Sequence, residues 1–83
     1  MERTLWDRFF AEQFTERDRA KFLEELATRS SGKRRFNFNV FDVVINVDSG
    51  TVTVEDILEA DSTETIPIDE FAARVRIAVV TRE

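Results

Sequence analysis

Apolar residues recur at helical spacing along the first third of the chain, where they form two separate sets. The first set is Leu5, Trp6, Phe9, Phe10 and Phe14, and the second is Phe22, Leu23, Leu26 and Ala27. At about 100° per residue, the centres of the two sets differ by well over 90° around one straight helix. Thr4 and Thr15 each precede an acidic residue by three positions, as in a capping box. The pattern predicts two helices, over about 4–14 and 16–29, and the alternative is one long or kinked helix.

The following apolar positions alternate as in a β-strand, and their phase changes once. Ser30, Ser31 and Gly32 end the helical region, and Gly32 suits a left-handed helix cap. Within residues 35–47, Phe36, Phe38 and Val40 are apolar at even positions, whereas Phe41, Val43, Ile45 and Val47 are apolar at odd positions. A change of phase by one residue requires a β-bulge or a strand that is covered on both faces. We predict a bulge near residues 40–41.

Asp48, Ser49 and Gly50 form the clearest turn signal, because Gly50 can supply the positive φ of a three-residue hairpin loop. The partner strand is predicted over 51–59. A polar loop follows at 61–65 and leads into a short third strand at Thr65 and Ile66.

A last helix is predicted from Pro67, which suits the first turn of a helix. Phe71, Ala72, Val75, Ala78 and Val79 have helical spacing, although residues 74–79 also alternate as in a strand. The sequence therefore predicts one α+β domain over residues 1–83. It contains two N-terminal helices (or one kinked helix), an antiparallel β-hairpin or small meander, and a C-terminal helix.

Composition narrows the function classes. The 83 residues include no Cys and no His, so thiolate chemistry, disulfides and histidine general bases are excluded. No stretch approaches the roughly 18 apolar residues of a membrane span. Acidic residues interrupt the first apolar stretch, which does not read as a signal peptide. We expect a cytoplasmic protein with no membrane association and no cofactor.

Charge is strongly segregated along the chain. Residues 1–35 hold nine basic and seven acidic residues, whereas residues 36–70 hold nine acidic residues and no basic one. A field of one sign accelerates association with an oppositely charged partner. We therefore predict that the 42–70 acidic block binds a basic protein, such as a nuclease or a toxin. The residues expected to carry this contact are Asp48, Glu55, Asp56, Glu59 and Asp61. The alternative is a solvated face that favours solubility.

The aromatic residues of the first helix allow a second interpretation. Trp6, Phe10 and Phe14 lie four residues apart and share one helical face. Such a stripe is typical of a core, but Trp and Phe are also common interface anchors. Trp6 and Phe10 are thus candidates for contact with a second copy. The alternative function is a structural or accessory homodimer.

The sequence gives little support for metal binding, catalysis or nucleic-acid binding. Asn46–Gly50 matches a calcium loop poorly, and Glu55 and Asp56 point to opposite faces of a strand, so we predict no metal site and no catalytic site. Lys33, Arg34 and Arg35 adjoin the acidic block, which argues against nucleic-acid binding. In general character, this small acidic chain is similar to bacterial toxin-immunity proteins and phage anti-defence inhibitors. We expect a non-enzymatic inhibitor or immunity-type protein.

Overall fold

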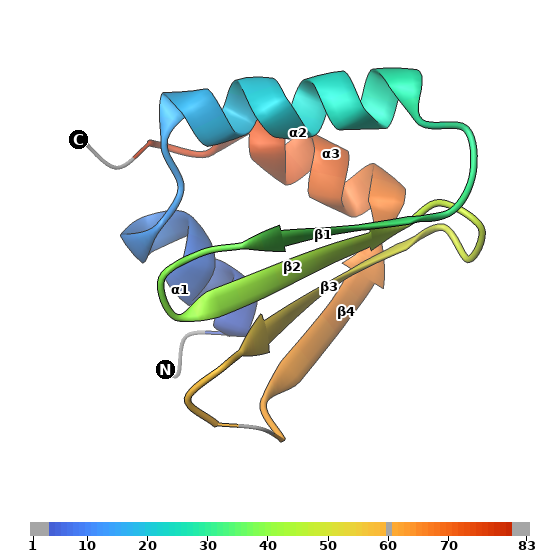
Figure 1. Cartoon of the computed structure of the whole chain (residues 1–83). Helices are drawn as coiled ribbons and strands as arrows, with labels where there is room; N and C mark the ends of the chain where they lie inside the picture. Colours follow the sequence, from blue (N-terminus) through green and yellow to red (C-terminus); the bar gives the residue numbers. More distant parts are fainter. Residues whose placement is uncertain (1–3, 60, 81–83) are drawn as a thin grey trace.

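The computed structural model describes residues 4–59 and 61–80, and it shows an α+β fold with three helices and a four-stranded antiparallel sheet (Figure 1). The strands follow one another as a meander, in the spatial order β1-β2-β3-β4. In chain order the elements are α1 (Leu5–Glu12), α2 (Glu16–Thr28), β1 (Lys33–Asn37), β2 (Phe41–Asn46), β3 (Thr51–Asp56), β4 (Thr63–Pro67) and α3 (Ile68–Ile77).

The break between the first two helices is confirmed, and both N-termini carry capping boxes. Thr4 Oγ1 accepts from the Asp7 N–H at 3.0 Å, and Thr15 Oγ1 accepts from the Asp18 N–H at 3.2 Å. In turn, each aspartate carboxylate accepts a hydrogen bond from the backbone N–H of its threonine. These bonds satisfy N–H groups that a helix start leaves without an intrahelical partner. Thr15 therefore begins a new helix with a new direction, which is why its apolar stripe is rotated.

The predicted single strand with a bulge is wrong, because residues 33–46 form a hairpin of two strands. The Phe38 N–H donates to the Phe41 carbonyl at 2.7 Å and closes the turn. Phe36 faces Val43 and Arg34 faces Ile45, so even positions of β1 lie opposite odd positions of β2. Residues that lie opposite one another share a face of the sheet. The change of phase in the apolar alternation is therefore caused by the turn between β1 and β2.

Two glycines adopt positive φ, but only one has the predicted role. Gly50, with φ of 70°, lies in the predicted turn between β2 and β3. Gly32, with φ of 86°, is not the helix cap that the sequence suggested, because α2 already ends at Thr28. It lies in the link to β1, where its N–H donates to Asp48 Oδ1 and its carbonyl accepts from the Val47 N–H.

The second half of the chain agrees with the predicted order and differs in its boundaries. β3 ends at Asp56 instead of residue 59, and the short third strand extends over the five residues of β4. The C-terminal helix is confirmed, and the strand alternative for residues 74–79 is wrong. Arg19 of α2 binds the end of this helix, because its guanidinium donates to the Arg76 and Ala78 carbonyls at 2.6 Å each.

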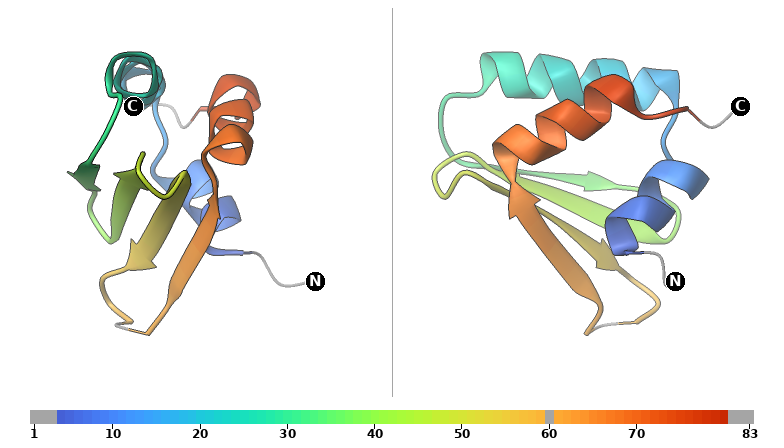
Figure 2. Two further views of the ribbon diagram at one scale, coloured as in Figure 1. Left: turned by 90° about the vertical axis from the view of Figure 1, so that its right-hand side faces the viewer. Right: turned by 180° about the vertical axis from the view of Figure 1, so that it is seen from behind.

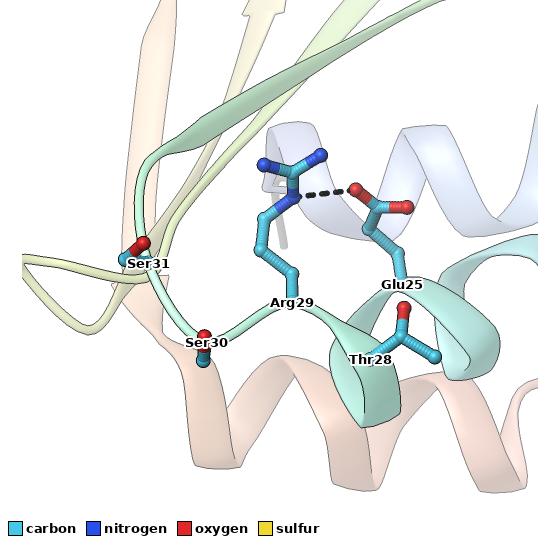
Figure 3. A pocket seen from close by; sticks show the side chains of 5 residues that line it. All are labelled: Glu25, Thr28, Arg29, Ser30 and Ser31. Carbon is cyan, nitrogen blue, oxygen red and sulfur yellow. Dashed lines mark hydrogen bonds and ion pairs between the residues drawn. The ribbon is translucent and has the colours of Figure 1, made fainter.

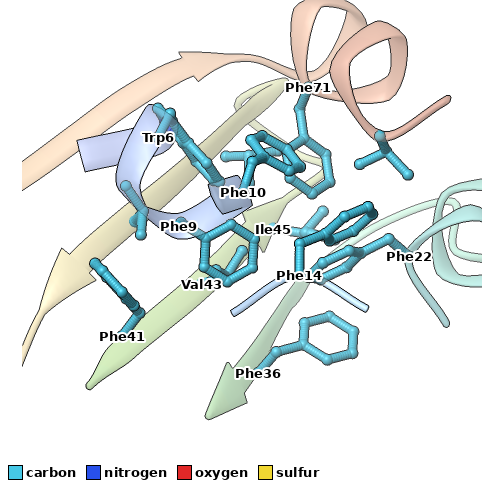
Figure 4. Close-up of a cluster of buried hydrophobic side chains, with 13 residues drawn as sticks. Trp6, Phe9, Phe10, Phe14, Phe22, Phe36, Phe41, Val43, Ile45 and Phe71 are labelled. Carbon is cyan, nitrogen blue, oxygen red and sulfur yellow. The ribbon is translucent and has the colours of Figure 1, made fainter. Parts of the chain in front are cut away.

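The three helices cover one face of the sheet and leave the other face open (Figure 2). Aromatic rings from the helices and strands fill the space between them (Figure 4). Phe9 lies at the centre, with its ring centroid between 4.9 and 6.3 Å from those of six other aromatic residues. The buried apolar residues are Trp6, Phe9, Phe10, Phe14, Phe22, Phe36, Phe41, Val43, Ile45, Val52, Val54, Phe71 and Val75. Within residues 4–59 and 61–80, no helix has the length and apolarity needed to cross a membrane.

Candidate partner-binding surface

The turn between β3 and β4 lies at the same end of the sheet as the turn between β1 and β2. The Ile57 N–H donates to the Val40 carbonyl at 3.0 Å and joins the two turns. The turn between β2 and β3, which holds Asp48, lies at the opposite end, because adjacent turns of an antiparallel meander alternate between ends. The acidic residues of the block are therefore divided between two ends of the molecule.

Asp56 lies at the end of β3 and binds the β3–β4 turn from its buried side. It lies on the buried face of β3 because Val52, Val54 and Asp56 alternate inward, and only 4% of its surface is exposed. Its Oδ1 accepts from the Leu58 N–H at 2.9 Å, and its Oδ2 lies 3.4 Å from Arg8 Nη1. The carboxylate thus connects the turn to α1.

Further along the turn, Glu59 is bonded twice to Ser62. The Ser62 N–H donates to the Glu59 carbonyl at 2.9 Å, and the Ser62 hydroxyl donates to Glu59 Oε2 at 2.8 Å. The Asp56 N–H in turn donates to the Ser62 carbonyl at 3.0 Å. These bonds join Glu59 to Ser62 and tie Ser62 to the end of β3, and the side chains of Ile57 and Leu58 face outward from this turn.

These two outward side chains are large and apolar. Leu58 is 76% exposed and Ile57 is 48% exposed, and the exposed acidic residues Glu59 and Asp61 follow them in the chain. Burying a side chain of this size contributes roughly 1.5–3 kcal/mol, and for Leu58 folding leaves most of this contribution to be gained by binding a partner. We refer to Ile57, Leu58, Glu59 and Asp61 as the β3–β4 turn surface. It combines an apolar contact with two carboxylates.

The structure brings only Glu59 and Asp61, among the five predicted contact residues, to this surface. Asp48 lies at the far end of the sheet and accepts from the Gly32 N–H at 3.1 Å. Glu55 lies on the open face, with its Oε1 3.9 Å from Arg35 Nη1. Asp56 is buried, as described above. Three of the five predicted contact residues therefore lie outside the β3–β4 turn surface.

Trp6 and Phe10 both belong to the core of this chain. Trp6 is fully buried and packs on Phe71, with ring centroids 5.3 Å apart. Phe10 keeps a small exposed edge beside Ile77 and Ala78, at a shallow groove between α1 and the end of α3. Of the two roles that the sequence allows for Trp6, the structure shows the one in the core.

Glu64 has a role that the sequence did not indicate. It lies on the inward face of β4, and its carboxylate accepts from the backbone N–H groups of Leu5 and Trp6 at 3.3 and 3.4 Å. A carboxylate at a helix start is favourable because the helix dipole is positive there. The two partners are 58 and 59 residues away in sequence, so no local pattern reveals the contact.

Ile57 and Leu58 did carry a signal in the sequence. Two consecutive apolar residues cannot both face the same side of a strand. Once the alternation of β3 reaches Asp56, at least one of the pair must therefore point outward or lie in a turn.

A separate hollow lies at the end of α2, between Glu25, Thr28, Arg29, Ser30 and Ser31 (Figure 3). Its two charged groups bind one another, with Arg29 Nε 2.6 Å from Glu25 Oε1. Because the pair is internally neutralised, the hollow offers little charge to a ligand. In the described part of the chain, no group of three acidic side chains is arranged to hold a metal ion.

Comparisons of the chain with family models, with curated proteins and with solved structures gave no match.

Proposed function

We propose that this chain is a non-enzymatic protein-binding module, an inhibitor or immunity-type protein that occludes a basic surface of its partner. The observation that carries the proposal is the exposed pair Ile57 and Leu58, which lies on the hydrogen-bonded β3–β4 turn and is followed by the exposed carboxylates of Glu59 and Asp61. Leu58 supplies an apolar anchor, and the two carboxylates supply attraction to lysine or arginine. Protein interfaces typically have an apolar centre that is surrounded by a polar rim.

A stable interface needs more area than one turn provides, because each partner buries about 800 Å² in a typical complex. The β1–β2 turn lies beside Ile57, and the open sheet face begins next to it at Glu55. We expect the contact to extend in these two directions. The cysteine-free composition favours the cytosol as the compartment of this interaction.

The experiment is affinity capture from the host lysate with three matched pairs of baits. Leu58→Ser removes the apolar anchor, and Ile77→Ser removes an equally exposed apolar residue on α3. Glu59→Gln combined with Asp61→Asn removes two charges at the turn, and Asp69→Asn combined with Glu70→Gln removes two charges from the start of α3. The wild type and its Ile57→Ser variant form the third pair. Circular dichroism first establishes that each variant is folded.

The expected result is one basic protein that the wild type and the α3 variants retain and the turn variants lose. Burying the exposed three-quarters of Leu58 is worth about 1–2 kcal/mol, so Leu58→Ser is expected to weaken binding roughly tenfold. With the purified partner, the association rate is expected to fall as salt rises, because exposed charges are screened beyond about 8 Å at physiological ionic strength. A captured protein that the turn variants retain, or an association rate insensitive to salt, refutes the proposal.

The alternative function, a homodimer, is favoured by a different observation. Ile77 and Val79 are both highly exposed at the end of α3. Light scattering over a wide concentration range decides this alternative, since a monomer at every concentration excludes it. A dimer that Ile77→Ser converts to a monomer would establish it.

A further inference from the structure

β1 is an edge strand whose free backbone groups form an uninterrupted row. The bonds from Phe38 to Phe41 and from Val47 to Gly32 show which residues of β1 are bonded to β2. In an antiparallel pair the bonded residues alternate. Lys33, Arg35 and Asn37 therefore direct their N–H and C=O groups away from β2, and all three residues are exposed.

The opposite edge of the sheet, β4, has fewer free backbone hydrogen-bonding groups than β1. By the same reasoning, the bonds from Asp56 to Ser62 and from Ile68 to Gly50 leave Thr63, Thr65 and Pro67 facing outward on β4. Pro67 has no N–H to donate. β1 consequently offers three donor and acceptor pairs, whereas β4 offers two pairs and one lone acceptor.

The edge of β1 is also positively charged. Lys33, Arg34 and Arg35 are consecutive, and only Arg35 forms ion pairs within the described residues, with Asp42 at 2.8 Å and Glu55 at 3.9 Å. The Arg34 guanidinium lies over the Phe36 ring at 5.2 Å. Like charges on paired strands repel, so this edge disfavours pairing with β1 of a second copy. The same charges complement an acidic strand.

On the helix-covered face, α2 runs over β1 (Figure 2). A cleft lies there beside the edge of β1. It is lined by Lys21, Glu24, Glu25, Arg34 and Phe36. Glu25 is already paired with Arg29, which leaves Lys21, Arg34 and Glu24 as its unpaired charges among residues 4–59 and 61–80. Alternate side chains of a strand added to β1 would enter this cleft.

We propose that the free edge of β1 binds an extended acidic segment of a partner protein as a fifth strand of the sheet. Backbone bonds to Lys33, Arg35 and Asn37 provide the pairing. Lys33 on the open face, and Lys21 and Arg34 on the covered face, favour carboxylates at neighbouring positions of the segment. This site shares no residue with the β3–β4 turn surface, so either can fail without the other.

The probe is a labelled synthetic peptide of alternating Glu and Val, with a Lys and Val peptide as its control. Binding is measured by fluorescence anisotropy, and its position by hydrogen exchange of backbone amides in NMR spectra. At a peptide concentration ten times its Kd, exchange at Lys33, Arg35 and Asn37 should slow about tenfold by mass action. Amides of β2 and β3, which are already bonded within the sheet, should change little.

Two substitutions at one position separate backbone pairing from charge. Arg35→Pro and Arg35→Gln both remove the ion pair with Asp42, but only proline removes the outward N–H. Proline is tolerated at an edge position whose N–H faces solvent. We expect Arg35→Gln to bind the acidic peptide within a few-fold of the wild type and Arg35→Pro to lose it. Equal binding by both variants, each shown to be folded, overturns the proposal.

Charge is tested with a second matched pair that does not depend on the proline variant. Arg34→Glu reverses a charge at the edge, whereas Arg17→Glu makes the same change on the exposed start of α2. The first should weaken peptide binding at least about tenfold, equivalent to 1.4 kcal/mol, and the second should leave it almost unchanged. The proposal is overturned if both substitutions weaken binding equally or if the Lys and Val peptide also binds. It is likewise overturned if the chain self-associates through these amides or if an oligonucleotide displaces the peptide.

Discussion

Replacing Asp56 by alanine tests whether this buried carboxylate holds the β3–β4 turn in place. The substitution removes the acceptor of the Leu58 N–H, at 2.9 Å, and the partner of Arg8 Nη1, at 3.4 Å. A hydrogen bond to a charged group contributes about 1.5–3 kcal/mol. The Arg8 side chain is 37% exposed, so the ion pair adds less than about 1 kcal/mol. We expect Asp56→Ala to lower the free energy of unfolding by about 2–3 kcal/mol.

The assay is urea unfolding followed by the fluorescence of Trp6. Trp6 is the only tryptophan of the chain and is fully buried, so its emission shifts to longer wavelength on unfolding. With a denaturant slope of about 1–3 kcal/mol per molar, the midpoint should fall by roughly 0.7–3 M. An unchanged slope identifies a change in stability alone, without a change in the surface exposed on unfolding.

The matched control is Asp56→Asn, which keeps Oδ1 as an acceptor for Leu58 and removes the charge that faces Arg8. Its expected cost is below about 1 kcal/mol. If Asp56→Ala lowers the free energy of unfolding by less than about 0.5 kcal/mol, or if both variants lower it equally, this hydrogen bond does not stabilise the turn.

Two further predictions concern the core and the start of α1. Phe9→Ala should cost about 3–5 kcal/mol in urea unfolding, while Ile77→Ala should cost under about 0.5, and a loss below about 1.5 for Phe9 contradicts its central position. Glu64→Gln should lower stability by about 0.3–1 kcal/mol and speed amide exchange at Leu5 and Trp6. Unchanged exchange at these two amides would show that the carboxylate does not cap the helix.

The sequence predicted the elements that depend on local signals. Both capping boxes, the turn at Gly50 and the helix after Pro67 are local, since the residues that define each lie within a few positions of one another. The error at residues 38–41 has a physical cause. A bulge and a tight turn both change the phase of the alternation, and no glycine or proline marks this turn.

The candidate surface was only partly predictable, because it depends on register and on distant contacts. Charge density along the chain indicated an acidic region, but alternation within β3 places Glu55 and Asp56 on opposite faces. Asp48 lies at the other end of the sheet because the strands form a meander. The exposure of Leu58 depends on which side chains the helices cover, and that information is absent from the local sequence.

The dependence of α1 on the rest of the fold has a consequence for synthesis of the chain. Its eight residues are too few for a helix to persist alone in water, since isolated helices below about 12–15 residues are marginal. Its start is bound by Glu64, and its rings pack on Phe41 and Phe71. Because α1 is synthesised before the partners that it packs against, it is among the last elements of this fold to become stable. Until α3 has been made, the nascent chain carries Trp6, Phe9 and Phe10 without all of their partners, and in this interval it is most prone to aggregate.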